Sequence, residues 1–91
     1  LGEGQNMEFK IHARAESIGR EVCAFLNSGG GYVICGVDEH GDLSGVEMKS
    51  DVSQLEYAIH NNISPKALVS IEINEIDEKQ VIVIEVPAGK D

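Results

Sequence analysis

Three consecutive glycines precede an apolar segment in NSGGGYVICGV, residues 27–37, and they limit what the surrounding chain can form. Glycine readily adopts the left-handed backbone conformation that ends helices, whereas residues with side chains resist it. The residues before the glycines have apolar side chains at helical spacing, and those after them are continuously apolar. We therefore predict a helix that ends at the glycines and a strand that leaves them. The strand is expected to be central in its sheet because both of its faces are apolar.

The same glycines do not match a phosphate-binding loop. A P-loop places Lys and then Ser or Thr directly after its last glycine, but Val37 and Asp38 follow Gly36. A dinucleotide fingerprint that starts at Gly29 needs its third glycine where Ile34 stands. Phosphate loops also run from a strand into the positive end of a helix, which is the reverse of the predicted order. The pattern therefore argues against a nucleotide site.

Periodicity predicts two helices. Residues 14–27 place apolar side chains at helical spacing and end at the glycines. Residues 51–63 carry a second apolar stripe, which starts at a capping-box pattern and ends before Pro65.

Alternation and apolar runs predict the strands. Residues 7–12 alternate apolar and polar side chains, and residues 32–37 form the apolar strand after the glycines. A short strand is expected over 43–46. Strands over 68–76 and 81–86 then form a hairpin that turns at Asp77–Gln80.

The expected fold class is α/β (α+β), with a mixed sheet of about five strands and two helices packed on it. The order is β-α-β-β-α-β-β. A chain of 91 residues has the length of one small domain with a single core. The sequence begins with Leu and stops soon after a strand-like segment, so we expect residues 1–91 to be one domain cut from a longer protein and truncated at its C-terminus.

The net charge of −9, from 16 acidic and 7 basic side chains, opposes non-specific binding to nucleic acid. A local stripe of basic side chains or a bound metal ion can still attract nucleic acid to a protein whose net charge is negative. Cys23 and Cys35 are too far apart for a C-x-x-C motif and favour free thiols in a reducing cytoplasm. No apolar run approaches the roughly 20 residues that cross a bilayer. We expect a cytoplasmic protein without a membrane partner.

Several short motifs are spread over nearly the whole chain. They are Glu3-x4-Glu8-Phe9-Lys10, Ala24-Phe25-x-Asn27-x-x-Gly30-Gly31, Gly36-Val37-Asp38, Gly45, Pro65 and the strand Val81-Ile82-Val83-Ile84-x-Val86-Pro87. Together they resemble the Schlafen-type AlbA-like domain of prokaryotic proteins. Members of that family continue into a segment with an Arg-x-Gly motif that this sequence lacks, which agrees with a C-terminal truncation.

The resemblance implies a DNA-binding or transcriptional-regulator module. We therefore expect a nucleic-acid-associated domain of a cytoplasmic regulator that binds DNA or RNA in an assembly, such as a homodimer, and requires no cofactor. The candidate contact residues are Lys10, Arg14, Arg20 and Asn27. Lys10 either pairs with Glu8, contacts phosphate or is solvated on the polar face of its strand. Asn27 either caps the first helix or points into a cleft beside the central strand.

The resemblance also implies a second function, a metal-dependent RNA or DNA endonuclease. Animal members of the family use two glutamates and an aspartate, which correspond to Glu3, Glu8 and Asp38 here. Mg²⁺ and Mn²⁺ prefer carboxylate oxygens and water, and such an ion activates water for attack on a phosphate. The alternative for these residues is that they are solvated carboxylates of an acidic protein.

A third alternative is a non-catalytic dimerisation or interaction domain. Under this alternative the expected place for pairing is the apolar strand over 81–86, which the truncation would deprive of its C-terminal neighbours, because an unpaired apolar edge strand recruits another chain. A large symmetric interface without a basic groove would favour this function.

Overall fold

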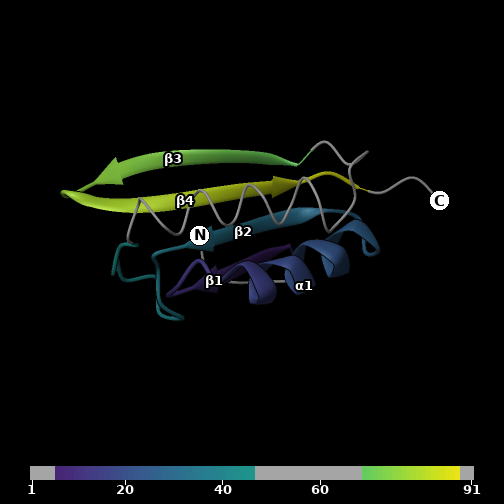
Figure 1. The fold of residues 1–91 in the computed structure, drawn as a ribbon, viewed down its shortest axis with the longest axis horizontal. Helices are drawn as coiled ribbons and strands as arrows, with labels where there is room; N and C mark the ends of the chain where they lie inside the picture. The colour runs from purple at the N-terminus through teal and green to yellow at the C-terminus, as the bar shows by residue number, and fades with distance from the viewer. Residues whose placement is uncertain (1–5, 47–68, 89–91) are drawn as a thin grey trace.

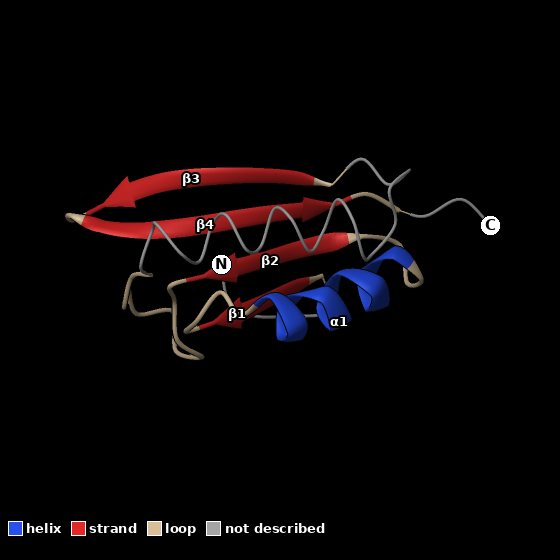
Figure 2. Cartoon of the chain, in the orientation of Figure 1, coloured by secondary structure: helices blue, strands red, loops and turns tan. Residues whose placement is uncertain are grey.

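The computed structural model describes residues 6–46 and 69–88, which form a mixed four-stranded sheet with one helix against a face of it (Figure 1). The elements are β1 (Met7–Lys10), α1 (Ala15–Leu26), β2 (Gly31–Cys35), β3 (Ser70–Ile76) and β4 (Lys79–Val86). The strand order is β1-β2-β4-β3. β1 and β2 are parallel and are connected through α1, while the other two pairs are antiparallel (Figure 2).

The predicted mixed α/β class is confirmed, whereas one predicted strand is wrong. Leu43 forms only an isolated bridge with Val37. The N–H groups of Ser44 and Gly45 both donate to the carbonyl oxygen of Gly36, at 2.7 and 3.0 Å, so the chain turns here instead of extending a ladder. The described residues therefore form four strands rather than about five. The predicted helix over 51–63 lies outside the described residues.

The glycine run ends α1 as predicted. Gly29 and Gly30 have φ values of 101° and 87°, and the N–H of Gly30 donates to the carbonyl oxygen of Phe25 at 2.7 Å. A Cβ at Gly30 would lie 2.6 Å from the carbonyl oxygen of Val86, and one at Gly31 would lie 2.6 Å from the Phe25 ring. The run therefore both reverses the chain and lets α1, β2 and the end of β4 approach closely.

The core is formed by buried side chains of α1, β2 and β4 and by Ala13, which lies just before α1. They are Ala13, Ile18, Val22, Phe25, Val33, Cys35, Ile82, Ile84 and Val86. β2 lies between β1 and β4, so the predicted central strand is confirmed. It ends at Cys35 rather than at Val37 because Gly36, with φ of 100°, turns the chain away from the sheet. Cys23 is exposed and Cys35 is buried, and both are thiols rather than halves of a disulfide, as predicted.

β4 is an interior strand, and this corrects the prediction that residues 81–86 form an exposed edge. It pairs with β2 on one side and with β3 on the other. Among the described strands the edges are β1 and β3. Within the described ranges, no helix has the length and apolar character that would let it cross a membrane.

The turn between β3 and β4 gives a prediction about stability. It has two residues, Asp77 and Glu78, rather than the four expected, and their φ values are 51° and 65°. Such turns favour Asn-Gly, because side-chained residues are strained at positive φ. We expect the double substitution Asp77→Asn/Glu78→Gly to raise the free energy of unfolding by about 1 kcal/mol. Urea denaturation measures this, and an unchanged or lower midpoint would contradict the assigned turn.

Candidate functional site

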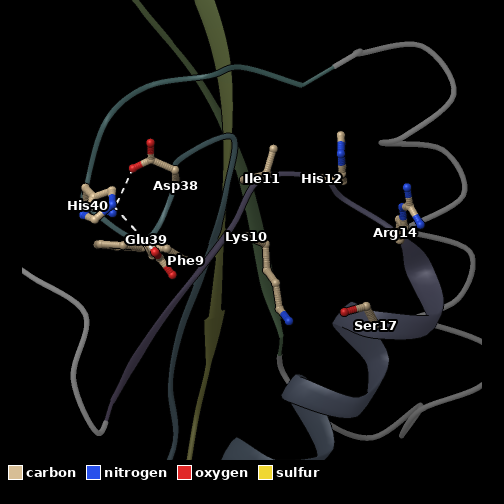
Figure 3. A pocket seen from close by; sticks show the side chains of 9 residues that line it. All are labelled: Phe9, Lys10, Ile11, His12, Arg14, Ser17, Asp38, Glu39 and His40. Carbon is tan, nitrogen blue, oxygen red and sulfur yellow. Dashed lines mark hydrogen bonds and ion pairs between the residues drawn. The ribbon is translucent and has the colours of Figure 1, made fainter.

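A cavity of about 740 Å³ lies where β1 leads into α1, opposite the loop that follows β2. The residues that line it are Phe9, Lys10, Ile11, His12, Arg14, Ser17, Asp38, Glu39 and His40 (Figure 3). Lys10 and Ser17 lie on the side of β1 that is next to α1, and the residues of the loop after β2, Asp38, Glu39 and His40, lie on the other side of β1 (Figure 3). The cavity therefore joins segments that are more than twenty positions apart in the sequence.

Parallel pairing of β1 and β2 brings these segments together. The carboxyl ends of parallel neighbours meet at the same edge of a sheet, and here Lys10 is the register partner of Cys35. The carbonyl oxygen of Lys10 then accepts hydrogen bonds from the N–H groups of Gly36 and Val37, at 2.7 and 3.2 Å. These bonds hold the start of the β2 loop against the end of β1.

One side of the cavity carries basic side chains and the start of a helix. Lys10, His12 and Arg14 line this side, which we call the cationic rim. Arg14 is the N-cap of α1, and its side chain makes no capping hydrogen bond. The first N–H groups of a helix lack intrahelical acceptors and carry partial positive charge. The rim therefore has three basic side chains beside the positive end of a helix dipole.

The basic side chains of the rim differ in how they are paired. Lys10 Nζ lies 3.3 Å from a carboxylate oxygen of Glu21 on α1, and both side chains are about three-quarters buried. This ion pair orients Lys10 along α1 and balances part of its charge. Arg14 is exposed and forms no ion pair with any residue that the structure describes. Arg14 is therefore the more available cation.

The opposite side of the cavity is an acidic turn organised by Asp38. Its Oδ1 accepts hydrogen bonds from the N–H groups of His40 and Asp42, each at 2.9 Å. The bond from Asp42 is the main reason that the pKa of Asp38 lies below its ordinary value of 3.8, and the bond from His40 adds to it, while desolvation acts in the opposite direction. Asp38 is therefore ionised at neutral pH and orders the turn.

This pKa predicts how stability depends on pH. Because folding lowers the pKa, the ionised Asp38 contributes stability above pH 3.8, and that contribution is lost as the pH falls through the lowered value. We expect Asp38→Asn to lower the free energy of unfolding at pH 7 and to have a smaller effect in acid. Thermal denaturation of both proteins between neutral and acidic pH tests this. A constant difference in melting temperature would contradict the role of the charge.

The metal site formed by the three carboxylates of Glu3, Glu8 and Asp38 remains a prediction. Glu8 is the register partner of Val33, five positions before Asp38, and does not line the cavity with it. Glu3 lies outside the described residues. Within residues 6–46 and 69–88, no three His, Cys, Asp or Glu side chains are grouped in a way that could hold a metal ion.

The cavity brings together some of the predicted nucleic-acid contacts and not others. Lys10 and Arg14 both line it. Arg20 is exposed on α1 but does not line it, and Asn27 is the exposed C-cap at the other end of this 12-residue helix. At 1.5 Å per residue, that end is about 18 Å away.

Four residues that line the cavity were not among the candidates predicted from the sequence: His12, Ser17, Glu39 and His40. A signal for the acidic turn was present in the sequence. Asp38 is followed by Gly41 and Asp42, and Asp side chains commonly hydrogen-bond the backbone of turns that contain glycine.

The family model described as Schlafen, AlbA_2 matches residues 3–91, nearly the whole chain. The chain belongs to this family. The resemblance deduced from the short motifs is thereby confirmed. No curated protein matches the sequence.

Solved structures share the Schlafen AlbA_2 fold with this chain. The crystal structure of the DIP2311 protein from Corynebacterium diphtheriae aligns with a TM-score of 0.75 and 21% identity, over 96% of this chain and 21% of that one. The solution NMR structure of the N-terminal domain of a RecG-related protein from Nitrosomonas europaea aligns with a TM-score of 0.67 and 21% identity, over 99% of this chain and 67% of that one. The chain thus spans about a fifth of the length of the DIP2311 protein.

Proposed function

We propose that this Schlafen AlbA_2 domain binds nucleic acid by placing phosphate groups on the cationic rim of Lys10, His12 and Arg14. The observation that carries the proposal is the gathering of these side chains at the start of α1 in a chain whose net charge is −9. Helix N-termini bind phosphate through free N–H groups and the helix dipole. An arginine adds a bidentate, charge-assisted contact.

The acidic turn limits where the phosphates lie. Asp38 and Glu39 face the same cavity as the rim and repel a phosphate backbone. A bound strand therefore runs along the rim and directs its bases toward the turn. Carboxylates accept hydrogen bonds from base amino groups such as that of cytosine. The charge separation across the cavity thus orients the bound strand.

Two further observations support this proposal. The fold is shared with the N-terminal domain of a protein whose name relates it to the ATP-dependent DNA helicase RecG. The family resemblance implies DNA-binding regulators. We place this domain in a transcriptional regulator, where other segments add affinity that the acidic chain lacks.

Fluorescence anisotropy with labelled single-stranded DNA, RNA and duplex DNA over a series of salt concentrations tests the proposal. Two or three phosphate contacts give a log–log slope of affinity against salt of about −2. Absence of binding at low salt, or binding that salt does not weaken, would overturn it. Gels of the same mixtures with Mn²⁺ or EDTA show whether a strand is cut. Cleavage that EDTA abolishes would instead establish the metal-dependent endonuclease.

The Lys10–Glu21 ion pair gives a prediction for the same assay. Glu21→Gln removes the partner of Lys10 and leaves its full charge for a phosphate. We expect affinity for single-stranded DNA to rise about threefold, as loss of a partly exposed ion pair suggests. The control is Glu72→Gln, which changes the net charge equally on β3, away from the cavity. An equal rise in both variants would show an effect of net charge alone.

A further inference from the structure

β3 is an edge strand of the sheet that the described residues form. β3 pairs with β4, and within the described residues no strand lies on its other side (Figure 1). It is seven residues long and is therefore long enough to pair with an extended segment. Edge strands of this kind are templates for a further strand.

The register shows which backbone groups face outward. Ile76 and Lys79 flank the two-residue turn and are register partners, so they form the hydrogen-bonded pair that closes the hairpin. Bonded and non-bonded pairs alternate along an antiparallel ladder. Ile71, Ile73 and Glu75 therefore direct their N–H and C=O groups away from β4. Three residues thus offer six backbone groups to an incoming strand.

The side chains along this edge do not block such pairing. Ile73 and Ile76 are 41% and 45% exposed. Natural edge strands are often protected by charged side chains, especially Lys, by Pro or by a bulge, and the charges on this strand are the carboxylates of Glu72 and Glu75. Residues 70–76 contain neither Lys nor Pro, and their pairing with β4 runs without interruption.

The charge of the hairpin indicates the chemistry of the partner. Residues 70–86 contain five carboxylates, those of Glu72, Glu75, Asp77, Glu78 and Glu85, against the single ammonium of Lys79. Glu72 and Glu75 are both exposed on β3. A nucleic acid is repelled from this edge, and a second copy of the chain would bring two acidic hairpins together. A basic partner is attracted to it.

We propose that β3 binds an extended basic segment of another protein as an additional antiparallel strand. In such a pair the partner's aliphatic residues lie opposite Ile71 and Ile73, and its Lys or Arg residues lie opposite Glu72. The incoming backbone bonds to Ile71, Ile73 and Glu75. No residue of β3 lines the cavity beside α1, so this interaction is independent of the proposed nucleic-acid contact.

NMR of the ¹⁵N-labelled chain tests the proposal with three short peptides. The first alternates Lys and Val, the second alternates Glu and Val, and the third is the Lys-Val peptide with alternate backbone nitrogens methylated. We expect the first peptide alone to shift the amide resonances of Ile71, Ile73 and Glu75 and to slow their hydrogen exchange. Equal binding of the methylated peptide, shifts confined to other residues, or no shifts would overturn the proposal.

A charge-reversed variant tests the partner's chemistry. Glu72→Lys/Glu75→Lys is expected to weaken binding of the Lys-Val peptide about tenfold and to permit binding of the Glu-Val peptide. Both side chains are exposed, so the fold is retained, and an unchanged NMR pattern elsewhere verifies this. Unchanged preference for the Lys-Val peptide would overturn the proposal. Dimerisation of the unliganded chain through β3, seen by sedimentation, would also overturn the proposal, because a second copy of the chain would then be the strand that pairs with β3.

Discussion

Replacing Arg14 by Glu is expected to weaken binding of single-stranded DNA about tenfold or more. Hydrogen bonds to charged groups contribute about 1.5–3 kcal/mol, which corresponds to a factor of ten or more in affinity. Arg14 is exposed at the cavity and has no ion-pair partner among the described residues. A carboxylate in its place also repels the phosphate. The log–log slope of affinity against salt concentration should become shallower by about one, because one phosphate contact is lost.

Arg20→Glu is the matched control for this variant. It makes the same change in net charge on the same helix, but Arg20 does not line the cavity. Anisotropy titrations at one salt concentration should show a small loss for Arg20→Glu and a large loss for Arg14→Glu. Equal losses would mean that net charge, rather than the cationic rim, determines affinity. Circular dichroism verifies that both variants retain the helix.

Replacing Gly30 by Ala is expected to lower the free energy of unfolding by about 3 kcal/mol. Two costs combine. Gly30 has φ of 87°, where a side chain is strained, and its Cβ would lie 2.6 Å from the Val86 carbonyl oxygen and 2.8 Å from the Ala88 nitrogen. Both are backbone atoms, one at the last residue of β4 and one just after the strand, so the clash is relieved only by moving this part of the chain away from Gly30.

Gly29→Ala separates the two costs. Gly29 has φ of 101°, but a Cβ there would meet no atom within 4 Å. This variant should therefore lose only the conformational part, about 1 kcal/mol. Urea denaturation of both variants gives the comparison. Equal destabilisation would contradict the close approach of the glycines to β4.

Local chemistry explains which parts of the fold were predictable from sequence. Apolar spacing before the glycines predicted α1, and the alternation in 68–76 predicted β3. The error at 43–46 arose because a short segment with apolar residues at both ends, Leu43 and Val46, also fits a turn, and here the N–H groups of Ser44 and Gly45 bond to Gly36. The error about β4 arose because periodicity shows which faces are apolar but not which strands are neighbours.

The candidate site was predictable only in part for a similar reason. Residue type and charge were enough to select Lys10 and Arg14. His12 and Ser17 join them only because α1 begins directly after β1, and Asp38 faces them only because β1 and β2 are parallel and in this register. Sequence alone did not distinguish Arg14 from Arg20, whereas the position of each on α1 does.

The most direct test of the central claim is an NMR titration of the ¹⁵N-labelled chain with a short single-stranded oligonucleotide. We predict that the largest shifts occur at the amides of residues 10–17 and 38–40, around the cavity. Higher salt should reverse these shifts. Shifts centred on Asn27, on Arg20 or on the edge of β3, with the cavity amides unchanged, would contradict it.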